Sequence, residues 1–428
     1  MIKILQVRNI DSFVESRRQK TSEKDRKIVQ SILNDVKRNG DSAVKKYERK
    51  FNGRKTSQLR VSAKEIKEAR SKISREEVRA LNTMRIRLWS QERIRQASLD
   101  VPMEFETGSR RAFRGYGKFV AIPSVGCYIP GGQARYPSSA IMSVVSAATA
   151  GVKRIVVVSP PGRDGKIDPL TIVAAKMCGA TEIYKVGGAQ AIGALAYGTK
   201  SIPKVDKIVG PGGKFVSIAK LLVSDQTAID MVAGPTELGI IADASSDPEL
   251  VALDLISQAE HSKDTMCFVI TQSKTKAKQI QKSIEKLIPD VKRRSIIKES
   301  ISKNGFIAVC RNQNEMIELA NKIAPEHLEL MVKNARSLSK KITGAGFVLI
   351  GKNTPSAASD YLLGTNHILP TNGFGRTRGG LSVLDFLKLQ TVVESDKSTL
   401  RIIQEELKLL TDAEGLPNHY KAVKRRLE

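Results

Sequence analysis

Cysteine and long apolar runs are both rare in this chain of 428 residues. The four cysteines lie far apart and form no Cys-x-x-Cys pair, which argues against a disulfide scaffold or a zinc ribbon and favours a reducing compartment. No run of about 18 apolar residues occurs, so no transmembrane span is expected. The start of the chain has no apolar stretch suited to a signal peptide. We therefore expect a cytoplasmic protein, with two or three domains and no membrane partner.

Histidine is equally scarce, since the chain contains only His261, His327, His367 and His419. All four follow residue 260, each with a carboxylate or carboxamide nearby in a predicted loop or helix end. Histidines that only solvate a surface would scatter along the whole chain. Imidazole, carboxylate and amide groups together are typical of a site for zinc or a similar divalent ion. Whether the four side chains meet in space is not determined by their spacing.

The chain carries 71 basic and 44 acidic residues, a formal net charge of +27. Such an excess favours nucleic-acid binding, because lysine and arginine release counterions from phosphates. The excess is densest in the first 100 residues, where interspersed acids on predicted helices are typical of a solvated face. No nucleic-acid recognition module is found. We therefore expect no specific nucleic-acid partner, and a nucleic-acid-binding protein is the alternative from another functional class.

The arrangement of apolar residues predicts helices first and then a regular alternation. Residues 1–100 have apolar side chains at helical spacing, with turns near Gly40 and Gly53. Strands are predicted at residues 119–122, 154–158, 182–186, 238–242, 266–271, 305–310 and 346–350. Helices are predicted at residues 138–150, 168–178, 248–259, 274–287 and 314–323. From about residue 372 the chain returns to a short, charged helical segment.

Strands that alternate with helices imply βαβ units and parallel sheets. The predicted strands fall into two blocks, at about residues 119–215 and 236–351. The predicted fold class is therefore α/β, with two doubly wound, Rossmann-like sheet domains and small helical segments at the two ends of the chain.

Three glycine-rich segments, at residues 126–132, 186–190 and 210–214, are candidates for a cofactor site. Glycine lets the backbone approach a phosphate, and a helix that begins after such a turn can bind an anion. We interpret residues 126–132 as a turn before a helix opened by Ser138 and Ser139, although it does not match the Gly-x-Gly-x-x-Gly fingerprint. Tight packing is the alternative explanation for each segment.

Two polar groups are candidates for metal binding and acid–base work. Gln258 and His261 lie three residues apart near a helix end, so they share a face and can hold one metal ion; a histidine at a helix C-terminus also suits the helix dipole. Glu326 and His327 lie in a predicted loop, where both side chains can face one cleft. Because ligands of open α/β sheets bind at the carboxyl ends of strands, we expect the site there.

At several blocks the sequence resembles histidinol dehydrogenase, from about residue 20 to the C-terminus. The matching blocks are residues 187–192 (GGAQAI), 205–212 (VDKIVGPG), 233–237 (AGPTE), 254–261 (DLISQAEH), 325–327 (PEH), 364–371 (GTNHILPT) and 414–416 (EGL) followed by His419. Agreement by chance over so many blocks in the same order is negligible.

The resemblance implies oxidation of L-histidinol to L-histidine through L-histidinal with two NAD+, the last steps of histidine biosynthesis. His327 matches the general base and Glu326 the residue that activates water on the aldehyde. One zinc ion per subunit is implied, held by positions matching Gln258, His261, Asp360 and His419. The positions that match substrate contacts are Thr236, Gln258, His261, His327, Asp360, His367, Glu414 and His419.

The resemblance also implies a cofactor site, an assembly and a domain division. NAD+ contacts match Tyr128, Gln190 and Gly213. The family is a homodimer, in which Glu414 and His419 reach the partner's site. The implied division is an N-terminal helical segment (1–24), a discontinuous first α/β domain (25–127 and 236–375), an inserted α/β domain (128–235) and a C-terminal segment (376–428).

Three positions depart from the family pattern. Gly213 replaces the asparagine of a Gly-Pro-Gly-Asn turn, which removes a side-chain contact to NAD+. Thr236 replaces a serine but keeps the hydroxyl group, and Ser359 replaces a glycine before Asp360. A dehydrogenase for another primary alcohol is the alternative within the family, and the matches at Glu414 and His419 favour the imidazole substrate.

Overall fold

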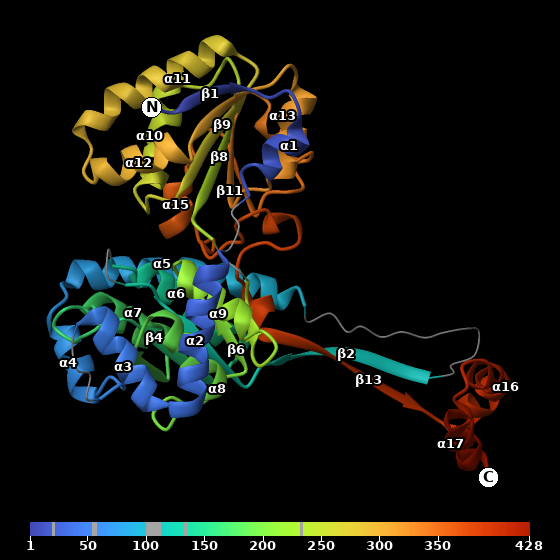
Figure 1. The fold of residues 1–428 in the computed structure, drawn as a ribbon. Coiled ribbons are helices and arrows are strands. Elements are labelled where there is room, and N and C mark those ends of the chain that lie inside the picture. The colour runs from blue at the N-terminus through green and yellow to red at the C-terminus, as the bar shows by residue number, and fades with distance from the viewer. Residues whose placement is uncertain (19–21, 54–57, 100–112, 132–134, 232–233) are drawn as a thin grey trace.

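The structure is a computed structural model that describes the chain except for residues 19–21, 54–57, 100–112, 132–134 and 232–233. Gly132 and Ala233, which belong to two of the predicted motifs, lie outside the described residues. Two α/β bodies lie one above the other and a long arm extends from one of them (Figure 1). Among the described residues, no helix combines the length and apolar character needed to cross a membrane.

The first body, domain A, is built on a six-stranded parallel sheet. Its strands, in spatial order, are β1 (Lys3–Gln6), β10 (Phe306–Val309), β9 (Met266–Thr271), β8 (Glu237–Ala242), β11 (His327–Met331) and β12 (Phe347–Ile350). One face is covered by α10 (Pro248–Ala259), α11 (Lys274–Leu287) and α12 (Arg294–Lys303). The other is covered by α1 (Ile10–Glu15), α13 (Gln313–Ile323) and α14 (Ala335–Ser339).

The second body, domain B, is built on a five-stranded parallel sheet. Its strands, in spatial order, are β5 (Glu182–Lys185), β4 (Arg154–Ser159), β3 (Ser124–Tyr128), β6 (Lys207–Val209) and β7 (Ala228–Ile229). One face packs against α4 (Ala63–Ser71), α5 (Arg75–Ala97), α6 (Pro137–Ala150) and α7 (Pro169–Cys178). The other packs against α2 (Glu23–Asn39), α3 (Asp41–Asn52), α8 (Gly188–Tyr197) and α9 (Lys214–Leu222). The two doubly wound sheets confirm the predicted fold class.

The N-terminal elements divide between the two domains. Helices α2 to α5 pack on domain B, whereas the predicted division groups residues 25–127 with the other sheet. Residues 3–6, in the segment predicted to be helical, form β1 and pair with β10. Ile4 and Leu5 pack against opposite faces of the sheet of domain A, the alternation that a strand requires.

Local sequence explains where several helices begin. The Asp168 side chain accepts hydrogen bonds from the amides of Leu170 and Thr171 at the start of α7. Asp247 does the same for the amide of Glu249, and Pro248 opens α10. An acidic N-cap followed by proline satisfies amides that have no partner inside the helix. The predicted starts of these two helices are therefore confirmed.

The first part of the predicted turn at residues 126–132 is instead β3, the central strand of domain B. All five of its residues are buried. A Cβ atom at Gly126 would lie 2.8 Å from Leu195 of α8, so glycine here permits close helix–sheet packing. The interpretation as a turn was wrong because a short strand buried on both faces shows no alternation of polar and apolar residues.

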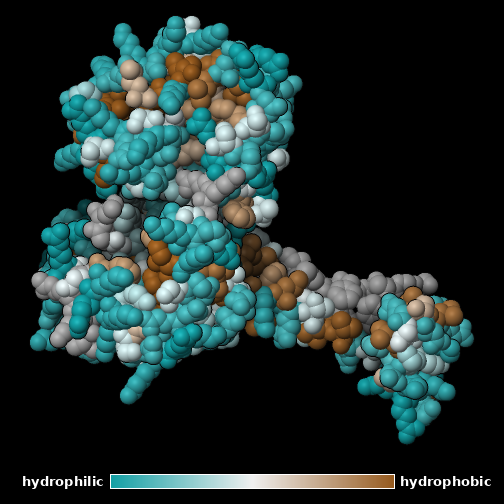
Figure 2. Space-filling view, in the orientation of Figure 1, coloured by the Kyte–Doolittle hydropathy of each residue, from teal (hydrophilic) through white to brown (hydrophobic). Residues whose placement is uncertain are grey.

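The arm is a two-stranded antiparallel ribbon of β2 (Phe113–Ala121) and β13 (Leu387–Ser395) that ends in α16 (Lys397–Ala413) and α17 (Pro417–Leu427) (Figure 1). The predicted strand at residues 119–122 belongs to it, and the tail predicted to be helical from about residue 372 contains the strand β13 before its two helices. Apolar side chains lie along the arm and its helices (Figure 2). Those exposed include Leu389, Val393, Ile402, Leu409 and Leu410.

Candidate active site

The predicted residues Glu326 and His327 lie where β11 of domain A begins, and both side chains are buried. Thr236 lies just before the neighbouring strand β8. His327 is therefore a strand residue, which corrects its placement in a predicted loop. The site was expected at the carboxyl ends of the strands, but His327 is the first residue of β11 and lies at their amino ends, so the expected location is also corrected. The chain passes between the two domains at this edge (Figure 1), so the edge faces domain B.

His327 lies between two carboxylates. Its Nε2 atom is 3.5 Å from Asp360 Oδ1, and its Nδ1 atom is 3.9 Å from Glu326 Oε2. Both ring nitrogens are buried without a well-formed hydrogen bond to a described residue. Burial alone would lower the pKa of His327, but Asp360 and Glu326 outweigh it and raise that pKa to about 9. A buried imidazole placed in this way can exchange a proton with a ligand bound beside it.

His367 links this cluster to domain B. Its Nδ1 atom donates a hydrogen bond of 2.8 Å to the backbone carbonyl of Asp360, and its Nε2 atom lies 3.4 Å from Ser139 Oγ at the start of α6. Burial lowers the pKa of His367. Ser139 was noted in the sequence only as part of a possible phosphate-binding helix start. The structure places it against a predicted substrate residue instead.

Gln258 and His261 lie at the C-terminal end of α10, which packs against α15 (Ser356–Tyr361), the helix that carries Asp360. Gln258 is buried. Burial lowers the pKa of His261, and the charge of Asp360 acts on it in the opposite direction. Two helices and the start of one strand thus bring His261, His327 and Asp360 near one another, and Gln258 lies three residues before His261.

The donor set fits a zinc ion. Gln258, His261 and Asp360 supply an amide, an imidazole and a carboxylate, and the last two are common zinc ligands. Asp360 Oδ1 is buried and accepts no hydrogen bond from the described residues. Within the described ranges no three His, Cys, Asp or Glu side chains form a group that could hold a metal.

Glu414 and His419 do not join the cluster within one chain. Glu414 follows α16 and His419 lies in α17, at the far end of the arm (Figure 1). Both side chains are exposed. Their assignment to the site of a partner subunit stays a prediction.

Tyr128 and Gln190, predicted to contact NAD+, are buried in domain B. The Tyr128 hydroxyl accepts a hydrogen bond of 3.0 Å from the amide of Gly188. Glu48 Oε1 accepts one of 2.8 Å from Gln190 Nε2 and one of 2.9 Å from the amide of Gly187. The Glu48 carboxylate thus occupies the N-terminus of α8, a common position for a phosphate. Sequence reasoning missed Glu48 because it lies among exposed charges on α3.

Gly213, the third predicted NAD+ residue, is the N-cap of α9 and has an extended backbone. A Cβ atom there would meet nothing within 4 Å, whereas at Gly212 it would collide with Val216. Space is therefore available for a side chain at Gly213, where the family has asparagine, whereas Gly212 is closely packed. Gly213 also has no side chain that could accept a hydrogen bond from the first amides of α9.

Glu237, the first residue of β8, is a site residue that the sequence did not single out. Its carboxylate accepts hydrogen bonds from the amides of Asn372 and Glu326, at 2.9 Å and 3.2 Å. Burial raises the pKa of Glu237 to about 7 and that of Glu326 to about 8. The signal that could have identified Glu237 in the sequence is an acidic residue at the start of an apolar strand.

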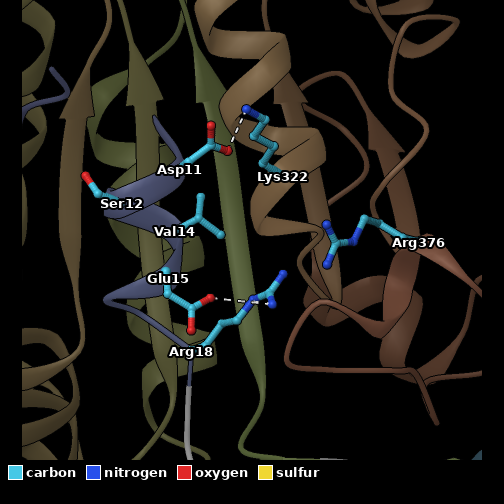
Figure 3. A pocket seen from close by; sticks show the side chains of 7 residues that line it. All are labelled: Asp11, Ser12, Val14, Glu15, Arg18, Lys322 and Arg376. Carbon is cyan, nitrogen blue, oxygen red and sulfur yellow. Dashed lines mark ion pairs between the residues drawn. The ribbon is translucent and has the colours of Figure 1, made fainter. Parts of the chain in front are cut away.

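A separate hollow of about 390 Å³ lies in domain A between α1 and the short 3-10 helix η2 (Phe374–Arg376) (Figure 3). Asp11 pairs with Lys322 at 2.7 Å and Glu15 with Arg18 at 3.6 Å. The hollow contains none of the predicted site residues, and most of its charges are paired with each other. It is not part of the candidate site.

Known proteins resemble this chain over almost its whole length. The family model described as histidinol dehydrogenase matches residues 15–427. The histidinol dehydrogenase of Methanococcus maripaludis is 44% identical over 400 residues, which cover 93% of this chain and 92% of that protein. That of Methanocaldococcus jannaschii is 41% identical over 401 residues, covering 94% and 92%. A crystal structure of histidinol dehydrogenase from Elizabethkingia anophelis has 33% identity and a TM-score of 0.93, covering 100% of this chain and 98% of that one.

Proposed function

This chain belongs to the histidinol dehydrogenase family, and from that premise we propose that it oxidises L-histidinol to L-histidine through L-histidinal with two NAD+. The observation that carries the proposal is the meeting of His327 with Asp360 and Glu326, beside Gln258 and His261, at the edge of domain A that faces domain B. A base, an acidic group and a metal-binding set in one buried place suit two successive oxidations of a bound substrate.

Gln258, His261 and Asp360 would hold a zinc ion, with His419 of the C-terminal helix as the fourth ligand. When bound, zinc supplies a template on which the imidazole and amino nitrogens of the substrate are held in a fixed orientation. The unpartnered Asp360 Oδ1 supports this assignment. Thr236, Glu414 and His367 would contact the substrate around the ion.

His327 takes the proton of the substrate hydroxyl as the hydride leaves the carbinol carbon. A ring with a pKa near 9 is cationic at neutral pH, so it must first lose its proton. A zinc ion bound to Asp360 would offset the negative charge of that carboxylate. The pKa of His327 would then fall toward the range in which the neutral ring acts as a base.

Glu326 activates the water that adds to the aldehyde. Its raised pKa, about 8, leaves a fraction of the group ionised near neutral pH, and that ionised fraction is a stronger base than an ordinary carboxylate. The resulting diol then loses the second hydride and becomes the carboxylic acid. His327 lies beside Glu326, so one buried place serves both steps.

Tyr128, Gln190 and Gly213 would form the cofactor site at the carboxyl ends of the strands of domain B. When bound, NAD+ accepts one hydride in each oxidation. Support comes from the open backbone at Gly213 and from Gln190 Oε1, which is buried without a hydrogen-bond partner among the described residues.

The active form is proposed to be a homodimer whose arms carry Glu414 and His419 to the partner's site. Two observations support it. Both residues are remote from the remaining site residues of their own chain, and the arm exposes apolar side chains along its length (Figures 1 and 2). Burial of such a surface against a second copy is favourable.

The test is NADH formation from L-histidinol by the full-length protein. We expect turnover with two NADH per substrate, loss after treatment with a chelator, and recovery when Zn²⁺ is added back. His327→Ala should abolish the alcohol oxidation. A zinc-loaded protein that fails to oxidise L-histidinol but oxidises another primary alcohol would overturn the proposed substrate.

A further inference from the structure

Domain A contains a pair of buried carboxyl groups that none of the assigned roles uses. Glu329 lies in β11 and is 1% exposed, and Asp254 is half-buried in α10. The side chains of the two residues interact with each other, and each shifts the pKa of the other. Glu329 Oε2 receives no bond from an N–H or hydroxyl donor among the described residues. Because an ionised carboxylate only accepts hydrogen bonds, a hydrogen bond between the two groups requires that one of them keeps its proton.

The electrostatic environment agrees with a shared proton. Burial raises the pKa of Glu329 to about 8, with Asp254 adding to the effect. Burial also raises the pKa of Asp254. Two such groups cannot both ionise without strong repulsion, so the pair retains one proton at neutral pH.

A third contact extends the pair to α15. The backbone amide of Ser356, the first residue of that helix, donates a hydrogen bond of 2.7 Å to Glu329 Oε1. Amides in the first turn of a helix have no partner within the helix. Glu329 therefore links β11 to α15 through the amide of Ser356, and its carboxyl group also interacts with Asp254 of α10.

In α10 and β11, the residues that make these contacts, Asp254 and Glu329, lie next to predicted site residues. Asp254 precedes Gln258 by four residues in α10, so both side chains lie on one face of the helix. Glu329 follows His327 by two residues in β11, so both point to the same side of the sheet.

The same relation holds in α15, where Ser356 precedes Asp360 by four residues, about one helical turn. Each of the three elements thus carries one member of the chain of contacts and one predicted site residue next to it. The contacts of Glu329 with Asp254 and Ser356 therefore join α10, β11 and α15, the same three elements that carry the predicted site residues.

We propose that Asp254 and Glu329 are positioning residues for the metal site. Their hydrogen bonds, continued to the amide of Ser356, fix the positions of α10 and α15 against β11. This holds the side chains of Gln258 and Asp360 at the spacing that one zinc ion requires. The inference rests on the proposed function, because the ion is the one proposed for that site.

Stability alone does not require this pair. Apolar residues of similar volume would fill the space without the cost of removing carboxyl groups from water. Apolar contacts have no preferred direction, however, whereas two directional hydrogen bonds set the spacing of three elements. Ligands held in this way by surrounding contacts bind a metal more tightly than unsupported ones.

Variants at Glu329 separate the hydrogen bonds from the charge. In Glu329→Gln the amide group can donate to Asp254 and its oxygen can still accept from Ser356, so both links persist. Glu329→Leu has a similar size and loses both. Asp254→Asn and Asp254→Leu form the same comparison from the half-buried side, in case Glu329→Leu does not fold.

Glu92 provides the matched control. It is also a fully buried glutamate, and it accepts a hydrogen bond from the amide of Val383 far along the chain. Glu92→Gln and Glu92→Leu therefore change a buried carboxylate that has no link to α10 or α15. They report how much zinc affinity falls from loss of stability alone.

The measurement is the affinity of the full-length, metal-stripped protein for Zn²⁺, by competition with a chromophoric chelator, alongside thermal unfolding. We expect Glu329→Leu and Asp254→Leu to bind zinc about 10–100-fold more weakly. The Gln and Asn variants should stay within about threefold of the unmodified protein, since the links persist. Equal affinity in the Leu variants, or a loss in Glu329→Gln as large as in Glu329→Leu, would overturn the proposal.

A second readout separates this inference from the proposed function. Hydrogen exchange of the α15 amides in metal-free protein should be faster in Glu329→Leu than in Glu329→Gln, because only the former frees the Ser356 amide. If the unmodified protein binds no zinc, the metal role fails. If it binds zinc but α15 exchanges equally in both variants, only the positioning role fails.

Discussion

Glu237 and Glu326 each accept a hydrogen bond from the backbone amide of the other. The Glu326 amide donates to Glu237 Oε2 at 3.2 Å, and the Glu237 amide donates to Glu326 Oε2 at 2.9 Å. The two residues stand at the starts of neighbouring parallel strands, β8 and β11. The proposed water-activating carboxylate is therefore held by the residue that opens the next strand.

Glu237→Gln is expected to slow aldehyde oxidation more than alcohol oxidation. Both carboxylate oxygens of Glu237 accept backbone amides, and a carboxamide offers only one acceptor oxygen, so one bond is lost in either orientation. Misplacement of Glu326 should then cost about 10–100-fold in the step that needs water. Single-turnover NADH formation from L-histidinol and from L-histidinal measures the two steps separately. A similar loss in both would mean that Glu237 only stabilises the fold, as Glu92→Gln would.

Glu326→Gln is expected to lower the pKa of His327 in metal-free protein. The Glu326 carboxylate lies 3.9 Å from Nδ1 and favours the imidazolium, so removal of this negative charge makes the proton easier to lose. The pKa should start near 9 and fall. Imidazole NMR can follow the titration because the chain has only four histidines. An unchanged midpoint would show that Asp360 alone raises this pKa.

Gly213→Asn is expected to lower the KM for NAD+ and leave the KM for L-histidinol unchanged. A Cβ atom at this position meets nothing, and the extended backbone of an N-cap suits asparagine. Gly212→Ala is the matched control, because its methyl group would collide with Val216 and lower the stability. Steady-state kinetics and thermal unfolding of both variants give the comparison. No change in either KM for Gly213→Asn would place the cofactor elsewhere.

Mixing His261→Ala with His419→Ala subunits is expected to restore activity. If the arm of one subunit completes the site of the other, each mixed dimer has one intact site and one doubly altered site. Random exchange would then recover about a quarter of the sites. NADH formation is measured before and after subunit exchange, with each variant alone as the control. Absence of recovery after verified exchange would contradict the shared site.

Much of domain architecture followed from local pattern. Caps such as Asp168 and Asp247 satisfy amides a few residues away, so the beginnings of α7 and α10 could be predicted from nearby residues. The alternation of strands and helices likewise indicated two parallel sheets, because apolar periodicity is also a property of neighbouring residues. By contrast, β3 and β11 were missed, because strands buried on both faces lack the alternation that marks a half-buried strand.

The sequence by itself determined the family, the α/β class and the residue types of the site, since these depend on local spacing and on motifs in a fixed order. Only the tertiary structure decided where they meet. The amino edge of the sheet of domain A, between the two domains, brings His327 against Asp360 and Glu326. It also places Glu237 beside Glu326, where each accepts a hydrogen bond from the backbone amide of the other. Contacts between residues tens to hundreds of positions apart depend on strand order and helix packing, which no local pattern encodes.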